Sequence, residues 1–131
     1  MSIAQKLGLA FVFLWFFGGG IGHFVPGGTA FFVSIVPPYL PNPKALVYIS
    51  GVFELLGAIG LLHASTRRWA GNGLILLTLA VSPANIHMWL HPELFPQAPQ
   101  WAYALRLLIQ IGLLWLIWWS TRERSARLLI A

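Results

Sequence analysis

Six polar side chains that can do chemistry lie in or beside apolar stretches of this sequence: His23, Glu54, Asn85, His87, Arg106 and Gln110. A carboxyl group and an imidazole can exchange protons, and a guanidinium or an amide can donate hydrogen bonds to a ligand oxygen. An ionisable side chain at the centre of a bilayer costs at least about 2.5–3.5 kcal/mol, so each needs a partner or a purpose. The sequence identifies no catalytic residue, and these six are candidates for lining a ligand pocket.

Glu54 and Arg106 leave two interpretations open. They can form a buried ion pair that fixes how two helices pack, which is a structural role. They can instead contact a ligand or handle protons, because charges within membrane spans usually serve a function. His23 and His87 are open to the same choice between hydrogen bonding at the membrane edge and chemistry.

A metal site would have to combine His23, His87 and Glu54. These residues come from three separate apolar runs, and none of them forms an HxxxH or ExxH pair with another. Zinc sites usually take two ligands from one short motif. We therefore predict no metal site.

The composition indicates a membrane protein. Of the 131 residues, 58% are hydrophobic and 8% are charged, whereas soluble domains have about 45–50% and about 25%. The mean hydropathy is +0.76. The chain has no cysteine, which excludes disulfides, thiolate metal sites and cysteine nucleophiles within it. The net charge of +5 does not predict nucleic-acid binding, because the cations lie at the ends of apolar runs and not along one surface.

Four apolar runs are long enough to cross a bilayer as helices: residues 7–24, 45–64, 69–90 and 101–119. Each is close to the roughly 20 residues that a transmembrane helix needs. We predict an all-α fold, a four-helix transmembrane bundle that forms one domain over residues 1–131. Two proline-rich outer loops, 25–44 and 91–100, join the spans. The apolar stretch 30–36 should lie at the interface or fold back over the bundle.

The Lys and Arg residues predict the orientation of this bundle. Six of them flank the spans on one side: Lys6, Arg67, Arg68, Arg122, Arg124 and Arg127. The loops of the other side contain only Lys44. Because positive charges favour cytoplasmic loops, both termini are predicted to be cytoplasmic.

This orientation places the polar residues in a common layer. Glu54 lies roughly 13 Å from the outer end of its span at 1.5 Å per residue. Gln110 lies at a similar depth, and Arg106 is shallower. Small residues surround Glu54 on its helix, which is typical of a face that packs against another helix. We therefore expect a polar pocket that opens outward.

Asn85 and His87 are alternative candidates for lining this pocket. They are about 200° apart on a regular helix, so they cannot both face inward. Pro83 should distort the helix just before them. The sequence leaves open which of the two faces the pocket.

Five motifs occur along the chain in a characteristic order: Gly20–Phe24 (GIGHF), Val36–Pro41 (VPPYLP), Tyr48–Gly57 (YISGVFELLG), Pro83–Met88 (PANIHM) and Leu105–Gln110 (LRLLIQ). Together they resemble the DoxX-like family of small bacterial membrane proteins, over residues 11–115. The resemblance implies a four-helix bundle in the bacterial cytoplasmic (inner) membrane. The family takes its name from a subunit of thiosulfate:quinone oxidoreductase, so the resemblance also implies a redox-accessory role with a quinone as the possible cofactor.

Three functions are consistent with these observations. The first is a protein that binds a lipophilic molecule such as a quinone. The second is a structural or assembly subunit, whose proline-rich loops dock a membrane-complex partner or which forms a homo-oligomer. The third is a small enzyme on a lipid substrate, in which Glu54 and a histidine catalyse an isomerisation by moving protons.

Overall fold

The computed structural model describes residues 1–122, which fold into helices joined by short turns. The elements are α1 (Ile3–Gly22), α2 (Pro26–Ile35), α3 (Pro43–Leu61), α4 (Ala64–Leu90), the 3-10 turn η1 (Pro92–Leu94) and α5 (Gln100–Thr121). All helices except α2 are long and apolar enough to cross a membrane. The described part of the chain is therefore all-α with four candidate spans, as the sequence predicts.

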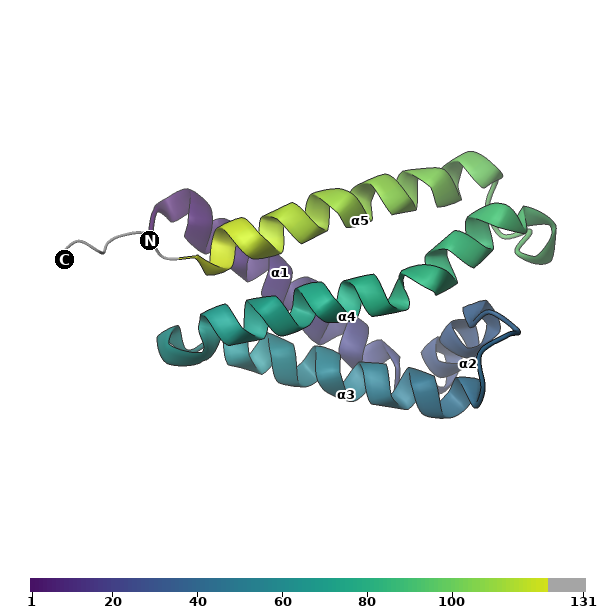
Figure 1. Ribbon diagram of the computed structural model, residues 1–131, viewed down its shortest axis with the longest axis horizontal. Helices are drawn as coiled ribbons and strands as arrows, with labels where there is room; N and C mark the ends of the chain where they lie inside the picture. The colour runs from purple at the N-terminus through teal and green to yellow at the C-terminus, as the bar shows by residue number, and fades with distance from the viewer. Residues whose placement is uncertain (123–131) are drawn as a thin grey trace.

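The four long helices pack in a ring in the order α1, α3, α4 and α5, and α5 contacts α1 to close it. Figure 1 shows α4 between α3 and α5, with α1 crossing behind them. The N-terminus, the α3–α4 turn and the end of α5 lie together at one end, here called the terminal end. Helix α2 and the α4–α5 connection lie at the opposite end, here called the α2 end.

Local signals fix where the helices begin. Ser2 caps α1, since its hydroxyl accepts the Gln5 N–H at 3.0 Å and the Gln5 side chain accepts the Ser2 N–H at 3.1 Å. This reciprocal pattern satisfies two donors that a helix start would otherwise leave free. Asn42 takes a left-handed conformation with φ of 47° before Pro43 opens α3. Asparagine tolerates this conformation better than most residues.

The first predicted loop, residues 25–44, contains the helix α2, which the sequence analysis did not predict. Pro26 lies in the first turn of α2, where its missing N–H costs nothing. The Thr29 hydroxyl donates a hydrogen bond of 2.6 Å to the His23 carbonyl. Helix α2 contacts α1, α3 and α4, so the apolar stretch folds back over the end of the bundle.

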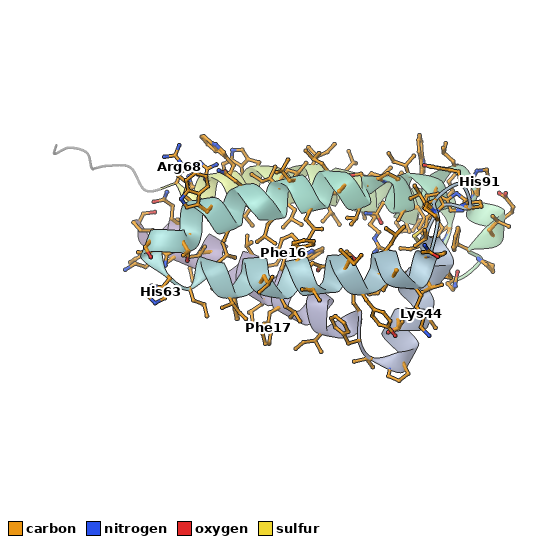
Figure 2. The ribbon with its side chains drawn as sticks, turned by 60° about the horizontal axis from the view of Figure 1, so that its bottom comes forward. Phe16, Phe17, Lys44, His63, Arg68 and His91 are labelled. Carbon is orange, nitrogen blue, oxygen red and sulfur yellow. The ribbon has the colours of Figure 1, made fainter. Side chains whose placement is uncertain are left out.

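The cations segregate between the two ends. Figure 2 shows Arg68 and His63 at the terminal end, and Lys44 and His91 at the α2 end. Lys6 and Arg122 lie near the start of α1 and the end of α5, so they share the terminal end. Arg124 and Arg127 lie outside the described residues. The charge separation behind the orientation prediction is present, and the orientation itself stays a prediction.

Two buried apolar clusters hold the bundle together. The larger one joins all four long helices: Val12, Phe16, Ala58, Leu61, Leu74, Leu113 and Ile117. The smaller one lies at the α2 end and consists of Ile35, Met88, Phe95 and Tyr103. The Tyr103 hydroxyl donates a hydrogen bond to the Phe95 carbonyl at 2.5 Å, which ties the proline-rich loop between α4 and α5 to α5.

Candidate functional site

A cavity of about 1220 Å³ follows the seam between α3 and α4 and reaches the interior at the α2 end. Five of the six predicted pocket residues line it: His23, Glu54, Asn85, Arg106 and Gln110. They come from four different segments of the chain, so only the folded bundle brings them together. His87 does not line this cavity.

His23 and Glu54 form the closest polar pair at the cavity. The His23 Nε2 atom lies 3.1 Å from Glu54 Oε2, and both side chains are largely buried. The other ring nitrogen, Nδ1, lies 2.7 Å from the Gly19 carbonyl oxygen. The ring also stacks on Phe32 of α2, with centroids 4.0 Å apart. Contacts from α1, α2 and α3 therefore fix the imidazole.

This geometry determines how many protons the pair holds. The Gly19 carbonyl can only accept a hydrogen bond, so His23 Nδ1 carries a hydrogen. A hydrogen bond between Nε2 and Oε2 then needs one further proton, located on one of these two atoms. Whether the pair is written as imidazolium with carboxylate or as imidazole with carboxylic acid, it shares one transferable proton and has no net charge.

Burial lowers the pKa of His23 below its ordinary value, because a charged ring loses its hydration, and the hydrogen bond to Gly19 opposes this only in part.

Two glycines allow α1 and α3 to approach closely around this pair. A Cβ atom at Gly19 would lie 2.8 Å from Glu54 Oε1, and a Cβ atom at Gly51 would lie 2.6 Å from the Cβ of His23. Real Cβ atoms do not come this close to other atoms. Larger side chains would push the helices apart and break the pair. Of the small residues around Glu54, Gly51 is thus explained by the packing of α1 against α3, and Gly57 lies against Leu74 of α4.

Asn85 and Gln110 form a different arrangement on the other wall of the cavity. The Asn85 amide donates to Gln110 Oε1 at 2.6 Å, and the Gln110 amide donates to the Ser82 hydroxyl. Ser82 in turn donates to the Thr78 carbonyl at 2.9 Å. These bonds join α4 to α5 beside Pro83. They occupy both the oxygen and the nitrogen of the Gln110 amide, so Gln110 has a structural role as a link between α4 and α5.

Arg106 lines the same cavity but does not form the ion pair with Glu54 that the sequence left open. Among the described residues its recorded partners are the Met88 sulfur, 4.0 Å from Nη1, and the ring of Phe31, 5.9 Å from Cζ. A guanidinium has five N–H donors, and sulfur and an aromatic face satisfy them poorly. Arg106 therefore presents a fixed positive charge and free hydrogen-bond donors to the cavity.

His87 lies apart from the other candidates. It lines a smaller cavity of about 360 Å³ at the α2 end, between α2 and the α4–α5 connection. Its ring packs near those of His91 and Phe95, at 4.9 Å and 5.7 Å between centroids. The choice that the sequence left open between Asn85 and His87 is thus decided: Asn85 faces the large cavity.

Four further side chains contribute to the site and were not predicted from the sequence. Thr29 donates to the carbonyl of His23, Ser82 accepts from Gln110, and Phe31 and Phe32 of α2 contact Arg106 and His23. Ser82 could have been found, because it lies three residues before Asn85 in the same apolar run. Phe31 and Phe32 lie in the apolar stretch 30–36, but with no helix predicted there the direction of their side chains could not be inferred, and Thr29 carried no signal.

The fold and the site define a class: a small helical bundle with four candidate membrane spans and a largely apolar cavity that contains a few fixed polar groups. The chain belongs to the DUF8561 family, a domain of unknown function, whose family model matches residues 11–123. No curated protein and no solved structure matches the chain.

Proposed function

We propose that this protein is an integral membrane protein of the bacterial cytoplasmic membrane that binds a lipophilic molecule with carbonyl oxygens, such as a quinone. In this proposal both termini face the cytoplasm and the α2 end faces outward. The DoxX-like resemblance supports a further part of the proposal, a role as the accessory subunit of a membrane redox complex.

The observation that carries the proposal is the guanidinium of Arg106 at the cavity wall. A charge in a membrane span is costly unless it has a partner or a purpose, and the described residues offer Arg106 no carboxylate or carbonyl acceptor. A ligand carbonyl in the cavity would supply that acceptor. Hydrogen bonds to charged groups contribute about 1.5–3 kcal/mol each, which is enough to select a carbonyl-bearing molecule over a plain hydrocarbon.

The rest of the cavity suits the same ligand. Its walls include the apolar side chains of Phe16, Phe32, Phe53 and Leu113. Apolar walls with a few convergent polar groups are the general form of a small-molecule site. The His23–Glu54 pair adds one transferable proton, which can be donated to a ligand carbonyl oxygen when the proposed redox partner supplies electrons to that ligand; the pair then takes up a proton again from solvent.

Mass spectrometry of the small molecules retained by gently purified protein tests the proposal. Wild type should retain a carbonyl-bearing lipophile, and Arg106→Met should lose it while remaining folded. Leu107→Met on the same helix, which does not line the cavity, is the matched control and should retain it. The proposal is wrong if wild type retains nothing, or if Arg106→Met retains the same molecule at the same level.

A second candidate function is an isomerase-type enzyme that acts on a membrane lipid. The proton shared by His23 and Glu54 favours it, because one acidic and one basic atom at 3.1 Å can remove a proton at one carbon and return it at another. Turnover of extracted lipids by the purified protein would support this candidate. Glu54→Gln should then abolish turnover without loss of ligand binding.

A further inference from the structure

The large cavity is open along its side. On α3 its lining includes Leu46, Ile49, Phe53 and Leu56, and on α4 it includes Thr66, Trp69, Gly73, Leu76 and Ala80. These positions recur every three or four residues, so they form one stripe on each helix. All of them are exposed at the surface of the bundle. The two stripes border a groove, here called the α3–α4 groove, that continues from the polar site.

The α3–α4 groove is long. Its lining on α4 runs from Thr66 near the terminal end to Asn85 at the polar site, which is about 28 Å at 1.5 Å per residue. This is nearly the full thickness of a hydrocarbon core, about 30 Å. The whole cavity, at about 1220 Å³, also exceeds the roughly 300–1,000 Å³ of ordinary small-molecule sites. A compact ring alone would leave most of it empty.

We propose that the ligand enters sideways from the bilayer, between α3 and α4, and keeps a long hydrocarbon tail in the α3–α4 groove while its polar head lies beside Arg106 and the His23–Glu54 pair. This inference rests on the proposed function, and it names the ligand as a long-tailed lipid. The exposed walls of the groove contain no charged side chain, so the tail of the ligand can displace bilayer lipid from the groove at little cost in free energy. A soluble ring without a tail would use only the polar end of the cavity.

Gly73 offers a way to block the groove without disturbing the fold. A Cβ atom at Gly73 would meet nothing within 4 Å, so a larger side chain has room and would extend along the groove. Gly112 on α5 is also exposed and also meets nothing within 4 Å, but it does not line the cavity. Gly73→Leu and Gly112→Leu are therefore a matched pair.

The test measures binding of two probes to protein in lipid nanodiscs, a benzoquinone without a tail and the same ring with a decyl tail. Wild type should bind the decyl compound more tightly, since each buried CH₂ contributes about 0.8 kcal/mol. Gly73→Leu should weaken the decyl compound by about tenfold or more and leave the tailless ring unchanged. Gly112→Leu should behave as wild type. Ala80→Leu, in the same groove, repeats the test if Gly73→Leu does not fold.

The other outcomes would contradict either the tail groove or the carbonyl site. If wild type binds both probes equally, or if Gly73→Leu weakens both or neither, the tail groove is wrong and the proposed carbonyl site stands. If wild type binds neither probe, the quinone-type proposal itself fails. If Gly73→Leu instead changes the oligomeric state in detergent, the groove is an interface between copies of the chain.

Discussion

The arginines at the two ends of the bundle are partnered in opposite ways. At the terminal end the Gln5 amide donates to the Trp119 and Arg122 carbonyls, both at 3.2 Å, and the Arg122 guanidinium donates to the Asn72 side chain. These groups join α1, α4 and α5 and satisfy one another. At the α2 end Arg106 faces a cavity with its donors largely unused. A closed polar network is typical of structure, and an open one is typical of a binding site.

Backbone packing causes this difference. At the terminal end Gly71 lies directly against Thr121, so α4 and α5 meet without a gap. Toward the α2 end α3 and α4 diverge, and α2 covers the end of the bundle (Figure 1). Phe32 of α2 then stacks on His23 and holds it at the edge of the space that remains. The polar part of the cavity therefore lies where α3 and α4 have moved apart.

The largest difference in the free energy of unfolding should be between substitutions at two glycines of α4 that lie two residues apart. A Cβ atom at Gly71 would overlap the side chain of Thr121, which is almost fully buried and donates to the Ile117 carbonyl at 2.7 Å. Gly71→Ala should lower the free energy of unfolding by about 1–3 kcal/mol, as other overpacked sites do. Gly73→Ala should raise it by up to about 1 kcal/mol through helix propensity.

Unfolding of both variants in the same detergent measures this difference. Because the two substitutions are chemically identical, the effects of the detergent and of helix propensity on the free energy of unfolding cancel in the comparison. Equal stability of Gly71→Ala and Gly73→Ala would show that the terminal end is no more tightly packed than the groove.

An intermediate effect should come from the link between Asn85 and Gln110. Removing one partner leaves a half-buried amide without its hydrogen bond, which costs at most about 1–3 kcal/mol. Asn85→Leu and Gln110→Leu should each destabilise the bundle, and the double variant should cost less than their sum. A double-mutant cycle on unfolding free energies measures this coupling. Additive effects would mean that the two amides do not act as a structural link.

The smallest effect should be a pH dependence that originates at the α2 end. The hydrogen bond between His23 and Glu54 keeps one shared proton on the folded pair. In the unfolded chain the histidine has its ordinary pKa of 6.5, so the two side chains hold one proton below pH 6.5 and lose it above. The free energy of unfolding should therefore change little below pH 6.5 and fall as the pH rises above it, by no more than about 1.4 kcal/mol per pH unit for one proton.

Unfolding midpoints measured between pH 5 and 8 test this sign. His23→Gln should remove the dependence that His23 contributes, and the exposed His63→Gln should keep the wild-type profile. A midpoint that stays constant or rises between pH 6.5 and 8 would indicate that the folded pair does not hold the shared proton.

The sequence predicted the fold better than the site, for physical reasons. Four apolar runs of about the right length leave a helical bundle as the natural solution in lipid, and the helices found begin and end within a few residues of the runs. Which polar side chains contact each other depends on the direction in which each side chain points, and the spacing of residues along the sequence does not show this direction. Opposite charges suggest an ion pair between Glu54 and Arg106. In the structure, close packing at Gly19 and Gly51 brings Glu54 to His23 instead.

We propose that Arg106 serves a ligand and not the fold, and one paired measurement tests this proposal directly. Affinity for the decyl benzoquinone and the unfolding midpoint should be measured on wild type and Arg106→Met in the same nanodiscs. We predict an affinity loss of about tenfold or more with a midpoint that is unchanged or higher, because a costly charge has been removed. An unchanged affinity, or an affinity that falls only together with the midpoint, would contradict the claim.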